Sequence, residues 1–275
     1  MKKSYLLAIV LSAMFLSFTV SCSKSEESAP TPDNPINHDN PLGVYNPGKK
    51  IRRIYHKEPG SDIKYLDQVW QWEGDFLESI KDYRQNGSVN YVEQFVYDGQ
   101  RLSRIEYTEG DYRGCVVFNY ENNELKSTEC YGPYDYSSLR SKAKFENRNG
   151  ELSKIVFQTD YYDISMQFTW NHDNVSMISI TGNDEFNNTA ELYYDQNNNP
   201  YKGFLSYWDF CLDTWDFIAE RSSFSFNNVT KVVYSNPIRN EVYNFIYQYD
   251  EDGYPIEQQT EHGTYNYRTY YYEYE

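Results

Sequence analysis

The feature that most constrains this chain is a short hairpin pattern that recurs about every 25 residues from Ile51 onward. In the stretch 95–107, apolar residues alternate up to Asp98-Gly99 and resume at Leu102 and Ile105. Glycine tolerates positive φ and an aspartate side chain hydrogen-bonds its own backbone, so Asp-Gly is typical of a tight turn. Alternation with a period of two on both sides of such a turn predicts a β-hairpin.

An apolar anchor residue follows each predicted turn and marks the repeat. These anchors are Leu77, Leu102, Leu125, Leu152, Val175, Tyr201, Val229 and Tyr254. A sustained spacing of about 25 residues indicates a repeat architecture rather than chance turns. Each repeat supplies two strands, so the sequence predicts an all-β meander of about 18 antiparallel strands with almost no helix. The repeat 201–226 is the longest, and we expect its two strands to be joined near residues 212–214.

The composition indicates what would fill the core of such a sheet. The chain has 30 tyrosines, 15 phenylalanines and 5 tryptophans. Aromatic residues favour strands, and tyrosine suits positions with one apolar side and one wet end. We therefore expect a largely aromatic core.

The number of strands limits how the sheet can close. About 18 strands in a round barrel would give a width of about 36 Å, too wide for side chains to fill. A lipid-facing barrel needs an unbroken outward apolar band, whereas here charged residues such as Arg52 and Arg53, or Lys126 and Glu129, fall on both strand faces. We predict a water-soluble barrel that flattens until its inner faces meet, about 10 Å apart. The alternative is an open single sheet, whose first strand would be protected by the basic residues in 49–53.

The N-terminus predicts export and lipid attachment. Residues 1–21 read as a signal peptide, with Lys2-Lys3 before an apolar stretch that is too short to span a membrane. Thr19-Val20-Ser21-Cys22 resembles a lipobox, which implies cleavage before Cys22 and lipidation of Cys22, although Thr19 replaces the usual leucine. The alternative is an ordinary signal peptide with a chance cysteine. Residues 22–48 carry five prolines among Ser, Asn and Asp and predict an extended tether, followed by the repeat domain 49–275.

Together, these features resemble a family of Bacteroidetes-type lipoproteins of unknown function with a porin-like fold. The resemblance covers the chain from Cys22 and is carried by the lipobox, the tether and the tandem Tyr-Asp-x-x-x-x-Leu-x-x-Ile hairpins. It implies a β-meander barrel and no known activity, so it assigns no catalytic residue. Residues 23–27 also resemble the acidic tract that directs such lipoproteins to the cell surface. A more distant similarity is to the tyrosine–aspartate repeats of secreted toxins and cell-wall proteins.

Three cysteines remain after Cys22. Cys115 and Cys130 flank the predicted turn at Asn122-Asn123 symmetrically, so a simple hairpin sets them opposite each other. A four-residue turn would place them at a non-hydrogen-bonded pair, where a cross-strand disulfide fits, and a two-residue turn would not. Both the disulfide and a pair of thiols therefore remain open. Cys211 has no evident partner, and the absence of a Cys/His cluster predicts no structural metal site and no cofactor.

The best candidate ligand site in the sequence is an aromatic cluster in the irregular repeat. It consists of Tyr207, Trp208, Phe210, Trp215 and Phe217. Exposed Trp and Tyr faces stack on sugar rings, and core packing is the alternative. The net charge of −16 disfavours nucleic acid as a partner.

We therefore expect a non-enzymatic binding or scaffold module, held in the outer membrane by its lipid alone and displayed at the cell surface rather than in the periplasm. Its partner would be a glycan or another envelope protein. One alternative is a hydrolase of glycans or peptidoglycan, because acidic turns at one sheet edge offer many carboxylate pairs. The other is a structural shell.

Overall fold

The structure is a computed structural model that describes residues 48–122, 124–132, 138–148, 151–159, 163–182, 187–211, 223–236, 240–263 and 265–275. All of these belong to one compact unit, Pro35–Glu275. The predicted signal peptide, Cys22 and the predicted tether before residue 48 lie outside the described residues.

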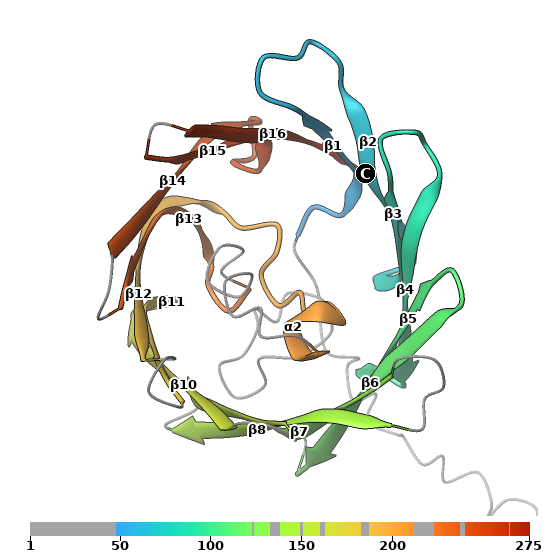
Figure 1. The fold of residues 1–275 in the computed structure, drawn as a ribbon, viewed down its shortest axis with the longest axis vertical. Helices are drawn as coiled ribbons and strands as arrows, with labels where there is room; N and C mark the ends of the chain where they lie inside the picture. The colour runs from blue at the N-terminus through green and yellow to red at the C-terminus, as the bar shows by residue number, and fades with distance from the viewer. Residues whose placement is uncertain are drawn as a thin grey trace, which may run out of the picture. The chain divides into compact units, whose positions relative to one another are not determined.

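The described residues form sixteen strands, in which each strand pairs antiparallel with its neighbours in sequence. The first eight are β1 (Ile51–Lys57), β2 (Tyr65–Glu73), β3 (Phe76–Tyr83), β4 (Val89–Asp98), β5 (Arg101–Glu109), β6 (Tyr112–Glu121), β7 (Glu124–Tyr131) and β8 (Leu139–Arg148). The others are β9 (Glu151–Thr159), β10 (Asp163–Asn171), β11 (Asn174–Thr181), β12 (Asn188–Asn198), β13 (Asn227–Ser235), β14 (Asn240–Tyr249), β15 (Pro255–His262) and β16 (Tyr265–Tyr274). Pairing of Ile51 with Tyr274 joins β1 to β16 and closes the barrel (Figure 1). The predicted all-β meander barrel is confirmed, and the open sheet is excluded.

The described residues form sixteen strands instead of the predicted 18 or so, and the difference arises in the stretch 201–226. In the described parts of this stretch, 199–211 and 223–226, the chain forms turns and a short helix, α2 (Trp208–Cys211), where strands were expected. Apolar residues in this stretch come in adjacent pairs, and both members of Phe204-Leu205 are 3% exposed. A strand of the wall buries one face only, so this pattern fits a segment that is surrounded by protein.

That segment also changes how the barrel is filled. The strands form an open ring around α2 in Figure 1, and α2 packs against β7 and β8. The opposite inner faces do not meet directly over aromatic side chains as expected. Instead, the described residues 199–211 and 223–226 enter the ring and supply the packing partner for the wall.

Each 25-residue repeat has the same structural feature at an equivalent position, a β-bulge just after the turn of its hairpin. In β4–β5 the register shifts between Val96 and Tyr97, so that Tyr97 pairs with Leu102 and Val96 with Arg104. The extra residue, Ser103, donates a hydrogen bond from Oγ to the Val96 carbonyl at 2.9 Å. The same bond from the bulged residue recurs at Ser153, Ser176 and Thr230.

The aromatic residue before each turn ties its hairpin to the preceding one. Tyr97 donates from its hydroxyl to the Leu77 carbonyl at 3.0 Å, and Tyr120 repeats this contact with Leu102 at 3.0 Å. Equivalent bonds run from Trp72, Trp170, Tyr194, Tyr247 and Tyr274 to Ile51, Leu152, Val175, Val229 and Pro255. Most of these carbonyls belong to the anchor residues. The aromatic residue of one repeat and the anchor residue of the preceding repeat are therefore the two partners of one recurring hydrogen bond.

The outer face of the wall carries ion pairs between neighbouring strands. Lys142 on β8 lies 2.5 Å from Glu129 on β7, and Arg53 on β1 lies 3.3 Å from Glu273 on β16. A lipid-facing wall carries an apolar belt at these positions. The described outer face is therefore suited to water, as the charge pattern predicted.

Of the two possibilities left open for Cys115 and Cys130, the structure excludes the disulfide between them. Cys115 is a free, buried thiol, and Cys130 forms a disulfide with another residue. A bulge between Asn119 and Tyr120 shifts the register by one, so Cys115 lies opposite Tyr131 and Val116 opposite Cys130. Because alternate residues face opposite sides of a sheet, this shift places the two sulfur atoms on different faces of the wall.

Candidate functional site

The segment between β12 and β13 is anchored at one edge of the barrel by asparagine side chains. Asn174 at the start of β11 accepts hydrogen bonds at Oδ1 from the backbone N–H groups of Phe226 and Asn227, at 3.0 and 3.1 Å. Asn199 and Asn228 donate from their side chains to the carbonyls of Ser225 and Asn198. These bonds fix both ends of the segment where it leaves and rejoins the wall.

Inside the barrel, four aromatic residues from the described part of the segment pack against different strands of the wall. Phe204 lies 4.8 Å from Trp70 on β2, measured between ring centroids. Tyr207 stacks on Tyr107 of β5 at 4.6 Å. Phe210 meets Phe118 of β6 at 5.4 Å, and Phe224 meets Phe168 of β10 at 5.6 Å. The segment therefore acts as an aromatic plug, a name kept below for residues 199–211 and 223–226.

The sequence-based site candidates belong to this plug. Tyr207 and Phe210 are each 3% exposed, and Trp208 is half-buried against Tyr91 and Tyr107. Their ring faces are used for packing, which corresponds to the alternative that the sequence left open. Trp215 and Phe217 lie outside the described residues.

A glycine in the wall makes room for the plug. A Cβ atom at Gly114 would lie 2.2 Å from the hydroxyl of Tyr207 and 2.7 Å from its ring. Such an approach is too close for any larger residue, so the Tyr207 ring depends on Gly114. α2 itself begins with a buried contact, since Asp209 accepts the Ser206 N–H at 2.6 Å.

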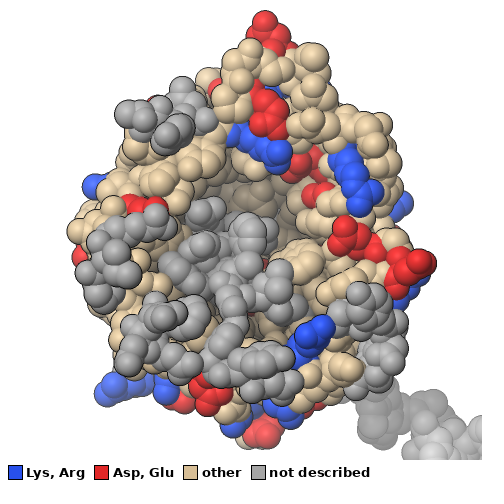
Figure 2. Space-filling model, viewed as in Figure 1, with Lys and Arg blue, Asp and Glu red and all other residues tan. Residues whose placement is uncertain are grey.

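Beside the plug the described residues enclose a cavity of about 180 Å³ in the barrel interior. Figure 2 shows the molecule hollowed at one end, with acidic and basic side chains on the rim. Aromatic residues form much of the cavity wall, namely Trp70, Tyr91, Tyr201, Phe204, Tyr247, Tyr270 and Tyr272. Polar residues interrupt this wall, namely Asp67, Gln68, Glu93, Asn199, Ser206, Asn228 and Gln258. Aromatic walls with a few convergent polar groups are typical of small-molecule sites.

Several polar groups of the cavity are held in place by the wall. Trp70 donates from Nε1 to the Gln68 side chain at 3.0 Å, and Tyr272 donates to the Gln258 side chain at 2.5 Å. Tyr247 donates to the Val229 carbonyl at 2.9 Å. The site is therefore preorganised, because these side chains are oriented before any ligand arrives.

Asp67 is the best-defined charged group at the cavity. Its carboxylate lies 2.8 Å from Nδ1 of His56, whose side chain is 3% exposed. Burial raises the pKa of Asp67 above its ordinary value, and the neighbouring His56 opposes this rise. On the next strand, burial also raises the pKa of Asp82, with Asp67 adding to the rise and a hydrogen bond from Asn90 opposing it.

Glu93 is the second carboxylate of the cavity wall. It is 2% exposed and lies on β4 between two other inward-facing residues, Tyr91 and Phe95. The sequence analysis did not single out either acid. The sequence did contain a signal that Glu93 faces the barrel interior, because strict alternation in 91–97 places it on the same strand face as the aromatic residues.

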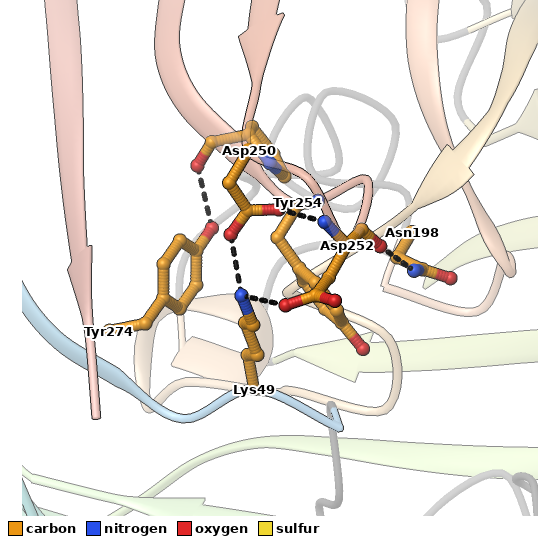
Figure 3. A network of polar contacts seen from close by, with 7 residues as sticks. Lys49, Asn198, Asp250, Asp252, Tyr254 and Tyr274 are labelled. Atoms are coloured by element: carbon orange, nitrogen blue, oxygen red, sulfur yellow. Dashed lines mark hydrogen bonds and ion pairs between the residues drawn. The ribbon is translucent and has the colours of Figure 1, made fainter.

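The barrel edge near the first strand carries a separate polar network (Figure 3). The ammonium group of Lys49 lies 2.8 Å from Asp250 and 2.5 Å from Asp252, which raise the pKa of Lys49. The same ammonium lies 5.7 Å from the ring centroid of Tyr254. This network fixes the residues before β1 to the turn between β14 and β15.

Two further expectations concern metals and membranes. Among the described residues, no group of three or more His, Cys, Asp or Glu side chains is arranged to hold a metal ion. No helix within the described ranges has the length and apolar character needed to cross a membrane.

Comparison with known proteins shows the fold and no more. No family model and no curated protein matches the chain. A crystal structure of a porin-like protein from Bacteroides uniformis superimposes with a TM-score of 0.53 at 12% identity, covering 82% of this chain and 96% of its own. A second porin-like protein, from Bacteroides vulgatus, covers 82% of this chain and 99% of its own at 8% identity and a TM-score of 0.49. The chain thus shares a porin-like barrel fold with the first of these proteins.

Proposed function

We propose that this chain is a lipid-anchored envelope protein whose barrel interior binds a small polar ligand, such as a single sugar unit of a glycan. The observation that carries the proposal is the preorganised cavity, with aromatic faces and carboxylate and amide groups around one space. Planar aromatic faces stack on the apolar faces of sugar rings, and polar groups between them fix orientation. Within the plug, Tyr207 and Phe210 support this site by packing, whereas Tyr201 and Phe204 lend their rings to the cavity wall.

The cellular address in this proposal comes from the sequence. The apolar leader and the lipobox ending at Cys22 support lipid attachment, and the acidic tract 23–27 supports display at the cell surface. The ion pairs on the outer wall support a barrel that stands in water beside the membrane, tethered by residues 22–48.

A glycan hydrolase is the rival, because Asp67 and Glu93 line the same cavity. Hydrolysis requires a sugar on each side of the bond that breaks, with both carboxylates within reach of it. The cavity of about 180 Å³ is smaller than the roughly 300–1,000 Å³ of typical ligand pockets and suits a single unit. Its size therefore favours binding of a terminal or free sugar over cleavage of a chain.

The test is a direct binding measurement on the purified protein, using calorimetry with a panel of monosaccharides. We expect saturable binding that is lost in Tyr91→Ala, which removes a ring from the cavity wall. Tyr193→Ala, which removes an exposed ring from the outer face, is the matched control and should bind like the parent. Release of free sugar from glycan oligomers would instead support the hydrolase.

Lipid attachment and location at the cell surface are tested by separate experiments. Labelled palmitate should be incorporated into the parent chain and not into Cys22→Ser. Protease added to intact cells should then remove the barrel if it is displayed outward, and its survival would contradict surface display.

A further inference from the structure

We propose that the cavity recognises a neutral acyl group of its ligand, such as the acetamido group of an N-acetylated sugar, and that Gln258 is the residue that recognises it. This inference rests on the proposed function, because it takes the cavity as the binding site, and it adds the chemical group that decides specificity.

The first argument is the available donor of Gln258. This half-buried residue lies on β15 and lines the cavity. Its Oε1 accepts a hydrogen bond from the Tyr272 hydroxyl at 2.5 Å, which fixes the orientation of the amide. Within the described parts of the chain, the Nε2 group of Gln258 has no hydrogen-bond partner. Gln258 therefore offers N–H donors to a ligand, while its acceptor is already in use.

The other amide side chains of the cavity wall are used to hold the structure. Gln68 accepts from Trp70 at 3.0 Å and hydrogen-bonds an aspartate carboxylate on β3. The buried side chains of Asn199 and Asn228 donate to backbone carbonyls at 3.2 and 3.0 Å. Gln258 thus differs from the other three, because its donor is not needed to hold the plug or the wall.

The second argument is the kind of oxygen that suits such a donor. A hydroxyl group that accepts from Nε2 still has its own proton to place, whereas a carbonyl oxygen is satisfied by donors alone. A carboxylate also only accepts. However, the described lining residues include no lysine, arginine or histidine to balance its charge, and an unbalanced charge is costly in an interior. A neutral carbonyl is therefore the best complement to Gln258.

The third argument is the pair of rings beside Gln258. Tyr247 on β14 and Tyr270 on β16 lie directly opposite Gln258 in the two neighbouring strands, and both line the cavity. Side chains opposed in this way have Cβ atoms about 4.5–5.5 Å apart. The Tyr247 hydroxyl donates to the Val229 carbonyl at 2.9 Å, so its ring has a fixed position. An acetyl group can place its carbonyl oxygen on Gln258 and its methyl group against one of these rings, which a hydroxyl group cannot do.

The test compares three hexoses with their 2-acetamido counterparts: glucose with N-acetylglucosamine, galactose with N-acetylgalactosamine, and mannose with N-acetylmannosamine. The two sugars of a pair differ only in the group on one carbon. Their affinities for the purified protein are measured by calorimetry. We expect an acetamido sugar to bind about tenfold more tightly than its hexose, the gain supplied by one hydrogen bond and one buried methyl group. Glucuronate, which carries a carboxylate, should bind no more tightly than glucose.

Two variants with the same chemical change locate the effect. Gln258→Glu keeps the shape of the side chain and an oxygen for the Tyr272 hydroxyl, but it replaces the Nε2 donor with a second oxygen. It should lower the affinity for the acetamido sugar about tenfold, to the level of its hexose. Gln259→Glu makes the same change on the opposite side of the sheet, beside the exposed Ile246, and should bind like the parent. If Gln258→Glu does not fold, Gln258→Met removes the donor instead, and the sugar pairs still test the acyl group on the parent.

The outcomes separate the two proposals. Equal affinities within every pair, tighter binding of the hexose, or a preference for glucuronate would overturn the acyl group and leave the cavity as a binding site. An unchanged affinity of Gln258→Glu for the acetamido sugar would overturn the assignment of Gln258. Absence of binding by every sugar would overturn the binding function and the inference with it.

Discussion

Alkaline pH should destabilise this barrel, because many of its tyrosines are buried as neutral groups. Burial is the largest cause that raises the pKa of Tyr97, Tyr120, Tyr272 and Tyr274 well above the ordinary value. In the unfolded chain a tyrosine loses its proton near pH ~10, so above that pH the unfolded state binds fewer protons than the folded state. Stability is therefore fully present below pH ~10 and falls as the pH rises above it.

The size of the loss follows from the same linkage. At about pH 11, each tyrosine that stays protonated in the fold and ionises on unfolding lowers the free energy of unfolding by about 1.4 kcal/mol. Four such residues together give about 6 kcal/mol. This equals much of the roughly 5–15 kcal/mol that stabilises a typical domain.

The assay is urea unfolding followed by tryptophan fluorescence at about pH 8 and about pH 11. We expect the free energy of unfolding to fall by at least about 6 kcal/mol between the two, because Tyr107, Tyr207 and Tyr249 are buried in the same way and add to the loss. Tyr97→Phe should reduce that fall by about 1.4 kcal/mol, although loss of its bond to the Leu77 carbonyl costs about 1 kcal/mol at either pH. Tyr267→Phe changes an exposed ring and is the control. Equal stability at the two pH values would refute the reasoning.

Three further predictions concern the plug and its surroundings. Gly114→Ala should destabilise the fold by about 1–3 kcal/mol, because the new Cβ meets the Tyr207 ring. The measurement is thermal unfolding, in which adding Tyr207→Phe should restore part of the loss. An unchanged melting temperature of Gly114→Ala would contradict the close approach. Peptide mapping without reduction should recover Cys130 in a disulfide-linked peptide and should find Cys115 alkylated only after denaturation; a Cys115–Cys130 peptide would contradict the register. Burial lowers the pKa of Lys202 to about 8, so the NMR signal of its methylated amine should titrate near that pH, and a midpoint at the ordinary 10.5 would show that the amine is not buried.

The repeat could be read from the sequence because each hairpin carries its own turn and alternation. Asp98-Gly99 and the apolar residues beside it specify one hairpin locally, and the same pattern predicts the next. The bulge was not predicted, since one extra residue such as Ser103 leaves the alternation of its neighbours almost unchanged. The equivalent extra residue in β6–β7, Lys126, decided the cysteine register.

The plug and the cavity were harder to predict, because their positions depend on the closed ring. Pairs such as Phe204-Leu205 were assigned to strands, although adjacent buried residues indicate a segment enclosed on all sides. The acids of the cavity, Asp67 and Glu93, come from different hairpins, and only closure brings them to one space. The spacing of these residues along the chain does not indicate that they line the same cavity.

The seam between the first and last strands bears on how the polypeptide reaches its native state. Arg53 and Glu273 are 220 positions apart in the chain, yet they form an ion pair across the seam. Contacts of such long range slow folding, since a large loop must close before they form. During synthesis one edge of β1 therefore stays unpaired until β16 emerges, although its other edge can already pair with β2. A product that ended before β16 would keep two open edges and would be prone to aggregate.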